Sequence, residues 1–184
     1  MVTLDKTCRT ANGWDINGFG QLKDGRGNIC PVTIIMPTLA MECKIDFDND
    51  VKGHHSFDDN SILIGRFLDK LDQKIQEAKD MLLERFEWIC SQSPDSAKFM
   101  YENGVMEGYV PEEGIRSALK HGTLAIGQIG LAETLQILIG KDHTTPEGME
   151  VAKRIEQLFK DRCAEFKQAY HLNFGVYYTP ECNI

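Results

Sequence analysis

The repeat of apolar residues predicts two long helices, over residues 61–90 and 145–172, because apolar side chains recur there every three or four positions. The apolar positions of the first are Ile64, Phe67, Leu68, Leu71, Ile75, Ala78, Leu82, Phe86 and Ile89. Those of the second are Met149, Ala152, Ile155, Phe159, Cys163, Phe166 and Tyr170. Thr144 and Glu147 have the spacing of a capping box, and Pro146 suits a first turn, so the second helix is expected to begin beside them.

Three apolar runs lack a helical repeat and are predicted to form strands, over residues 31–36, 123–126 and 173–180. The first run is rich in β-branched residues and is bounded by prolines, as is typical of a buried strand. Shorter helices are expected over residues 112–120 and 131–139. Because helical segments separate the successive strands, the sequence predicts a parallel sheet and an α/β fold. So few strands would not close a barrel on their own.

Two polar or glycine-rich stretches, residues 2–27 and 46–60, predict loops at the surface. The first stretch contains three dipeptides that favour tight turns, since glycine adopts positive φ without strain: Asn12-Gly13, Asn17-Gly18 and Asp24-Gly25. The last of the three is compatible with a small hairpin.

Composition excludes some classes of function. The chain of 184 residues is 42% hydrophobic, which is enough for one sizeable core, and it carries a formal net charge of -8. Nucleic-acid binding needs clustered lysine and arginine, which this acidic sequence does not provide. The amino terminus has no apolar leader, and no stretch reaches the roughly 18 apolar residues of a membrane span. We therefore expect a cytoplasmic protein with no membrane or nucleic-acid partner.

The glycine-containing segment "GQIGLAE", residues 127–133, has two interpretations. It lies where a predicted strand meets a predicted helix, so it could bring a helix N-terminus toward a phosphate. It lacks the lysine of a P-loop, so close packing of strand and helix is the favoured explanation of the glycines. The histidines lack metal-ligand spacing, so no metal site is predicted in this chain and a surface or capping role is expected for each: His54, His55, His121, His143 and His171.

The six cysteines contain no C-x-x-C pair and are expected to be reduced thiols. Cys90 and Cys163 lie on or beside the apolar faces of the predicted helices, which is typical of buried, unreactive thiols. Cys8 lies on no periodic face and stands beside Arg9 in the glycine-rich loop. A neighbouring cation favours the thiolate, so Cys8 is the candidate reactive thiol.

Four motifs together resemble the anaerobic (class III) ribonucleoside-triphosphate reductases, a family of glycyl radical enzymes. They are "TCRT", "GRGNICPVTIIMPTLAME", "HGTLAIGQIGLAETL" and "NFGVYYTPECN", beginning at Thr7, Gly25, His121 and Asn173. The resemblance implies part of a ten-stranded α/β barrel with long crossover helices. Within it, residues 1–30 would form the active-site loop and residues 31–184 the strands and crossover helices. The amino-terminal half barrel and the carboxyl-terminal glycyl-radical and zinc region would be absent from this segment.

The resemblance also assigns roles to individual residues. Cys8 corresponds to the cysteine that becomes a thiyl radical, and Asn28 to an asparagine that hydrogen-bonds the ribose hydroxyls. A strand-opening turn residue is the alternative interpretation of Asn28. Thr179, Pro180 and Glu181 correspond to a segment whose backbone N–H groups bind the substrate phosphates.

Several positions depart from the family's pattern. Glu181 stands where the family has alanine, and Cys182 where it has glutamate, which affects a carboxylate function but not a cradle of backbone N–H groups. The other departures are Cys30, Ile35 and Thr38. The resemblance therefore implies a divergent member of the family.

The implied reaction forms a deoxyribonucleotide by thiyl-radical abstraction of the ribose 3′ hydrogen. The implied cofactor is a glycyl radical supplied by a segment outside this chain. The implied partners are a ribonucleoside triphosphate, the remaining segments of the reductase and a radical-SAM activating enzyme. Alone, the segment is expected to be inactive. The alternatives are a non-catalytic nucleotide-binding protein and a protein that binds partners through its long helices.

Overall fold

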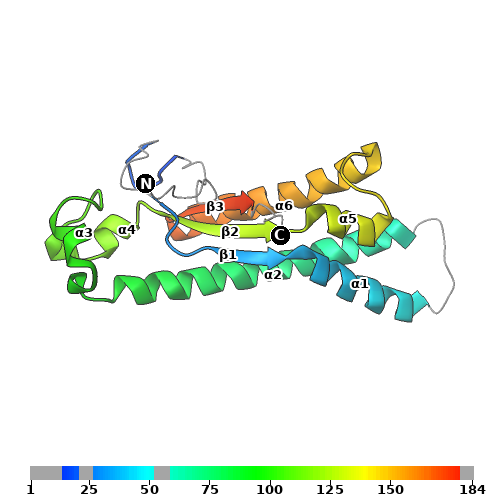
Figure 1. The fold of residues 1–184 in the computed structure, drawn as a ribbon, viewed down its shortest axis with the longest axis horizontal. Coiled ribbons are helices and arrows are strands. Elements are labelled where there is room, and N and C mark those ends of the chain that lie inside the picture. Colours follow the sequence, from blue (N-terminus) through cyan, green and yellow to red (C-terminus); the bar gives the residue numbers. More distant parts are fainter. Residues whose placement is uncertain (1–13, 21–26, 52–58, 179–184) are drawn as a thin grey trace, which may run out of the picture.

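The structure is a computed structural model that describes residues 14–20, 27–51 and 59–178. Its centre is a three-stranded parallel sheet in the order β1-β2-β3 (Figure 1). The strands are β1 (Val32–Ile35), β2 (Thr123–Ile129) and β3 (Asn173–Tyr178). The three predicted strands and their parallel arrangement are thus confirmed, as is the α/β class.

Two long helices run along the sheet, α2 (Asp59–Cys90) against β1 and β2, and α6 (Pro146–Tyr170) against β3 (Figure 1). Both were predicted, and their apolar faces form the core together with one face of the sheet. Phe166 of α6 meets Phe174 of β3 edge to face, with ring centroids 5.5 Å apart. The core is therefore a helix layer packed on one face of the sheet.

The prediction of a loop over residues 46–60 is wrong at both of its ends. Helix α1 (Met36–Val51) follows directly on β1, and α2 already begins at Asp59. Leu39, Cys43 and Phe47 are buried four residues apart on α1. This apolar face is narrow and acidic residues surround it, so the periodic signal was too weak to indicate a helix.

Helix α6 is capped by Thr145 and not by Thr144. The hydroxyl of Thr145 accepts a hydrogen bond from the backbone N–H of Gly148 at 3.1 Å, whereas Thr144 is bonded to Asp142. A capping side chain must accept from a free N–H group in the first turn of the helix. Thr145 does so because the N–H of Gly148 lies three residues further along the chain.

Shorter helical elements connect the layers. Helix α5 (Leu131–Ile139) was predicted and packs against α1, α2 and α6. The single helix expected over residues 112–120 is instead a 3₁₀ turn, Pro111–Glu113, followed by α4 (Arg116–Leu119). Gly114 separates the two with a φ of +71°, a conformation that interrupts a helix. Before them lie a 3₁₀ turn, Pro94–Ala97, and α3 (Lys98–Glu102).

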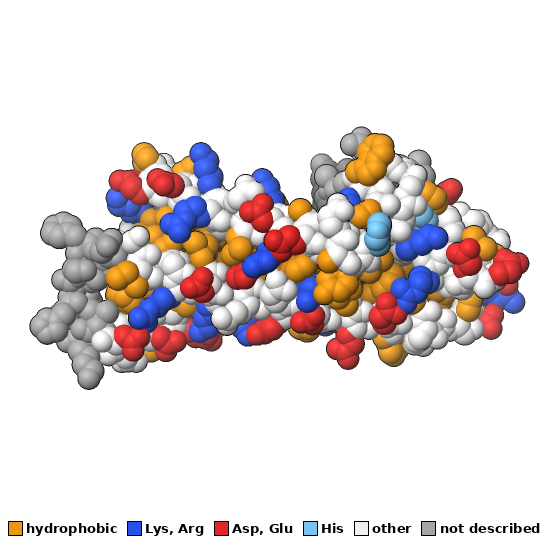
Figure 2. All heavy atoms as spheres, turned by 180° about the vertical axis from the view of Figure 1, so that it is seen from behind, with side chains coloured by type: hydrophobic (Ala, Val, Ile, Leu, Met, Phe, Trp, Pro, Cys, Tyr) orange, Lys and Arg blue, Asp and Glu red, His pale blue; other side chains and the backbone are white. Residues whose placement is uncertain are grey.

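The molecular surface is mixed in character. On the face opposite to the view of Figure 1, hydrophobic patches lie between acidic and basic side chains (Figure 2). In the part of the chain that is described, no helix combines the length and the hydropathy needed to cross a membrane.

Gly127 permits a close contact on the sheet face that points away from the helices. Its register partners are Thr33 on β1 and Tyr177 on β3, whose hydroxyl groups are hydrogen-bonded to each other. A Cβ atom on Gly127 would overlap the ring of Tyr177. The ring therefore lies across β2 only because residue 127 has no side chain.

We expect Gly127→Ala to lower the free energy of unfolding by about 1–3 kcal/mol, because the added methyl group overpacks this contact. The matched control is Gly65→Ala in the middle of α2, where an added Cβ meets no atom within 4 Å. That change should raise stability by roughly 0.5–1 kcal/mol, since alanine is the better helix former. Urea unfolding of both variants measures the difference, and equal effects would contradict the packing argument.

Candidate functional site

One of the five predicted site residues lies in the described part of the chain. Asn28 is described, whereas Cys8, Thr179, Pro180 and Glu181 lie outside the described residues. The turns proposed at Asn12-Gly13 and Asp24-Gly25 lie outside them as well.

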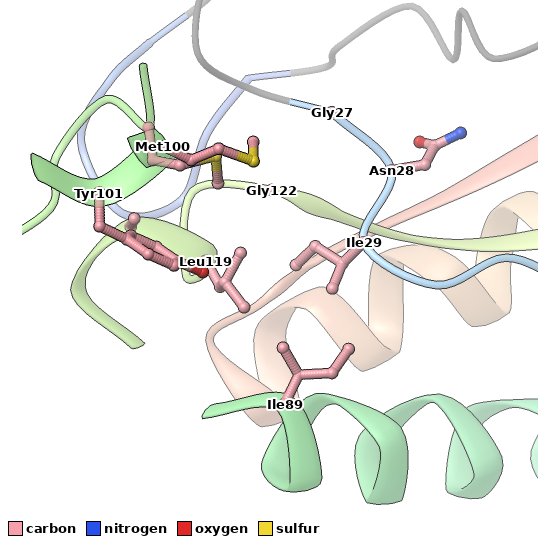
Figure 3. A pocket seen from close by; sticks show the side chains of 10 residues that line it. Gly27, Asn28, Ile29, Ile89, Met100, Tyr101, Leu119 and Gly122 are labelled. Carbon is pink, nitrogen blue, oxygen red and sulfur yellow. The ribbon is translucent and has the colours of Figure 1, made fainter. Parts of the chain in front are cut away.

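The backbone on either side of Asn28 extends the pairing of β1 with β2. Thr123 donates its N–H to Gly27 O at 2.9 Å, and Ile29 donates its N–H to Thr123 O at 3.0 Å. Residue 28 is thus held firmly at the start of the sheet, which is also what a strand-opening residue would require. Figure 3 shows its amide directed away from the side chains of Ile29 and Ile89.

A cavity of about 370 Å³ lies beside Asn28, at the end of the sheet where β1 and β2 begin. Its walls come from the end of α2, from α3 and α4, and from the chain before β1 (Figure 3). The side chains on the walls are mostly apolar: Ile29, Ile89, Met100, Tyr101, Met106, Ala118 and Leu119. No charged side chain among the described residues lines it, and burial raises the pKa of the Tyr101 hydroxyl, so the cavity suits an apolar group.

A buried polar cluster, which the sequence did not predict, joins Asp15, His121 and Asn173. The expectation of a surface or capping role for His121 is wrong, because the side chain is 4% exposed. Its Nδ1 lies 2.7 Å from Asp15 Oδ2, and its ring stacks on Phe19 at 3.6 Å between centroids. Asn173 donates to Asp15 Oδ1 at 2.7 Å.

The same cluster fixes the backbone of residues 15–19. Asp15 also accepts hydrogen bonds from the N–H groups of Asn17 and Phe19, at 2.9 and 3.1 Å, and Asn173 Oδ1 accepts from Ile16 N at 3.0 Å. The predicted turn at Asn17-Gly18 is confirmed, with Gly18 at a φ of +104°. An aspartate just before such a turn was the only local signal. Its partners, His121 just before β2 and Asn173 of β3, are distant in sequence, so no local pattern predicted them.

The hydrogen bonds of Asp15 decide its protonation. Burial by itself raises the pKa of this carboxyl group, but the donors from Asn173, His121, Asn17 and Phe19 outweigh it and lower the pKa to about 2. Asp15 is therefore ionised at neutral pH, and its oxygens are engaged by donors. The geometry gives it a structural task, which is to hold residues 15–19 against the starts of β2 and β3.

The described cysteines are poor nucleophiles. Burial raises the pKa of each of them, in the case of Cys163 to about 12, which keeps the thiols protonated at neutral pH: Cys30, Cys43, Cys90 and Cys163. The prediction of a buried thiol is confirmed for Cys163, and Cys90 is partly buried. Over the described ranges, no three His, Cys, Asp or Glu side chains gather as metal ligands would.

His171 has the capping role that was expected of it. It follows the last residue of α6 and adopts a φ of +52°, the left-handed conformation that ends many helices.

We expect the folded state to lose stability in acid through Asp15. Its pKa is lower in the folded chain than its ordinary value of 3.8, so the stabilisation is complete above about pH 4 and disappears as the pH falls toward 2. By linkage it amounts to roughly 2 kcal/mol. At pH 7 the variant Asp15→Asn should have a free energy of unfolding lower than that of wild type by about this amount. As the pH falls, the variant should not show the part of the stability loss that protonation of Asp15 causes in wild type.

The control for this measurement is Asp69→Asn, at an exposed position of α2. It should change the unfolding free energy by less than about 0.5 kcal/mol at any pH. Urea unfolding between pH 7 and pH 2 provides the test, and parallel pH profiles for wild type and Asp15→Asn would refute the role of the carboxylate.

Sequence comparison gives a family for the chain. The model of the family described as "Anaerobic ribonucleoside-triphosphate reductase" matches residues 3–183. The enzyme of that name from Escherichia coli K12 is 22% identical over 187 residues, which cover 96% of this chain and 23% of the relative. The one from Haemophilus influenzae is 23% identical over 186 residues, with 96% and 23% covered. The chain thus spans less than a quarter of the length of these relatives.

Solved structures agree on the fold. The anaerobic ribonucleotide reductase from Thermotoga maritima with glycerol in the active site superposes with a TM-score of 0.59 at 19% identity, over 83% of this chain and 21% of that one. The same enzyme in complex with dATP and CTP gives 0.56 at 18% identity, over 83% and 22%. The chain belongs to the anaerobic ribonucleoside-triphosphate reductase family.

Proposed function

We propose that this chain is a central segment of the catalytic barrel of an anaerobic ribonucleoside-triphosphate reductase. The observation that carries the proposal is the family match over residues 3–183. The parallel order β1-β2-β3 with helical crossovers supports it, since such a sheet extends into a barrel when further strands pair with its edges. In this proposal ten strands close the barrel, and the amino-terminal half barrel and the glycyl-radical and zinc region come from outside the chain.

The sheet face away from the helices becomes the barrel interior. Small residues occupy this face at register positions that pair with each other, Ala125 with Gly175 and Gly127 with Thr33. The pair of Ala125 and Gly175 leaves room for a loop close to the strands, whereas the ring of Tyr177 covers Gly127. Residues 1–30 are proposed to be that active-site loop, and residues 31–184 provide strands and crossover helices.

In the proposed reaction, Cys8 carries the radical. Cys8 would give the hydrogen atom of its thiol to a glycyl radical held by another segment, and the Cys8 thiyl radical would then take the 3′ hydrogen of the ribose. The 2′-hydroxyl would then take up a proton and leave as water, an external reductant would supply two electrons and a second proton to form the new C2′–H bond, and Cys8 would return its hydrogen atom to C3′. Sulfur suits this task because its S–H bond is close in strength to the ribose C–H bond, so the transfer is reversible.

Substrate binding is assigned to two segments of the chain. Asn28 is proposed to hydrogen-bond the ribose hydroxyls, and the backbone of Thr179, Pro180 and Glu181, directly after β3, to bind the phosphates. Backbone N–H groups suffice for that cradle, so glutamate at position 181 does not abolish it. The complex of the Thermotoga maritima enzyme with dATP and CTP supports a nucleotide substrate.

The proposed partners are a ribonucleoside triphosphate, the other segments of the reductase and a radical-SAM activating enzyme, in the cytoplasm. Alone, the chain is proposed to be inactive.

Replacing the proposed radical cysteine tests the mechanism. In the native assembly, isolated without oxygen, Cys8→Ser should abolish reduction of ribonucleoside triphosphates while substrate binding persists, because serine gives up its O–H hydrogen far less readily. The control is Cys163→Ala, at a buried thiol of α6, which should retain reduction. Residual reduction by Cys8→Ser, or equal loss in both variants, would reject the assignment.

Asn28→Ala separates the two interpretations of that residue. If the amide binds ribose, kcat/KM should fall about tenfold or more while the free energy of unfolding stays within about 0.5 kcal/mol of wild type, because a lost hydrogen bond to substrate corresponds to roughly 1–3 kcal/mol. The control is the exposed Asn103→Ala. A fall in stability with unchanged kcat/KM would favour the strand-opening role.

A further inference from the structure

The cavity of about 370 Å³ at the start of β1 and β2 has no role in the proposed reaction. Asn28 lies on its rim, but the amide to which ribose binding is assigned is directed away from Ile29 and Ile89 (Figure 3). The lining residues come from several separate segments: the chain before β1, the end of α2, α3 and α4. Walls from so many segments form a recess for a compact ligand, whereas the groove for a partner helix runs along its length.

The backbone groups of the two glycines on the wall are paired within the chain. Gly27 O accepts from Thr123 N at 2.9 Å, and Gly122 donates its N–H to Leu119 O at 2.9 Å. Gly122 O accepts from Asn173 Nδ2 at 3.3 Å. These groups need no hydrogen bond from a ligand.

The hydroxyl group of Tyr101 differs from them. The ring of Tyr101 lies against the ring of Tyr109, with centroids 4.8 Å apart, and Figure 3 shows its hydroxyl beside Leu119. Among the described residues, this hydroxyl has no hydrogen-bond partner. Burial raises the pKa of Tyr101, so the group stays protonated at neutral pH and can donate. The cavity therefore presents one unused donor within apolar walls.

Water does not suit this cavity. A buried water molecule makes about three hydrogen bonds to polar groups, and the wall presents only the hydroxyl of Tyr101 among the described side chains that face inward. An empty apolar cavity is unfavourable as well, because the side chains around it lose packing contacts. A mainly apolar ligand restores those contacts.

Charge and size restrict the ligand further. No charged side chain of the described residues lines the cavity, so an ionised ligand would lose its hydration without gaining a counter-charge. The volume lies within the roughly 300–1,000 Å³ of small-molecule sites and exceeds the about 150 Å³ in which benzene binds. Met100 and Met106 on the walls adapt readily to the shape of a ligand. A ligand with an aromatic or alicyclic ring therefore fits.

We propose that this cavity binds a small uncharged ligand with a ring-sized apolar body and one hydrogen-bond acceptor, such as a carbonyl oxygen. The apolar body packs against Ile29, Ile89 and Leu119, and the hydroxyl of Tyr101 donates to the acceptor. The site does not involve Cys8 and does not depend on the proposed reaction.

Three ligands of nearly equal shape test the proposal. Acetophenone is the probe, because it combines a phenyl ring with a carbonyl oxygen. In α-methylstyrene a CH₂ group replaces that oxygen, and in benzoate a carboxylate replaces the whole acetyl group. In NMR titrations of the full chain at neutral pH, acetophenone should shift the methyl signals of Ile29, Ile89 and Leu119 with a dissociation constant of about 1 mM or below. Benzoate should shift none of them.

Variants test the donor. Tyr101→Phe keeps the ring, and it should weaken acetophenone binding about three- to tenfold while α-methylstyrene binding stays within about twofold. The matched control is Tyr109→Phe, at a ring outside the cavity lining, which should leave the binding of both ligands unchanged. Ile89→Trp fills the cavity and should abolish the binding of both. If Ile89→Trp does not fold, the comparison of the two ligands in Tyr101→Phe decides alone.

Several results would overturn the proposal. They are the absence of a saturable shift with acetophenone, equal shifts with benzoate, and equal weakening of acetophenone and α-methylstyrene by Tyr101→Phe. The titration is repeated on the native assembly. Acetophenone binding to the chain alone but not to the assembly would mean that another segment fills the cavity, and this too would reject a small-molecule site.

Discussion

The carboxylate of Asp15 is the interaction on which the arrangement of the described amino-terminal segment depends. It collects donors from its own turn, from His121 before β2 and from Asn173 at the start of β3, which lie 106 and 158 residues away in sequence. A buried charge is tolerated only when such bonds surround it, and removing one partner leaves the others unsatisfied. The consequence is a backbone at residues 15–19 that is held to two strands at once. In the proposed enzyme this anchor lies a few residues after Cys8.

The two faces of the sheet follow from residue size. Toward the helices, β2 presents Leu124 and Ile126, which are fully buried, and neighbouring strands add Ile34 and Phe174. On the other face, β2 carries only alanine and glycine at positions 125 and 127. The ring of Tyr177 therefore lies directly on the backbone at Gly127. In the proposed barrel, large side chains on this face would fill the space that the active-site loop needs. The same sequence thus specifies a packed core on one face and a close approach on the other.

Sequence patterns predicted the elements that carry a strong local signal. Helices α2 and α6 each repeat apolar residues over many turns, so their presence was evident, whereas α1 buries a narrow stripe that few residues define. The capping residue of α6 was predicted one residue too early, at Thr144 in place of Thr145. The two side chains are chemically alike, so only the backbone conformation before the helix decides which of them caps it. The pairing of Asp15 with His121 had no local signal, because it depends on which strand starts the fold brings together.

Asp15 and Gln128, two buried polar residues near opposite ends of the sheet, differ in how completely their hydrogen-bonding groups are paired. Both oxygens of Asp15 have donors within the chain, so its low pKa and burial are explained by the fold alone. Gln128 is equally buried, yet its neighbours fix only the nitrogen of the amide, and the oxygen has no hydrogen-bond partner among the described residues. A buried acceptor without a donor is destabilising by about 1–3 kcal/mol, so this end of the sheet is less stable than complete pairing would make it.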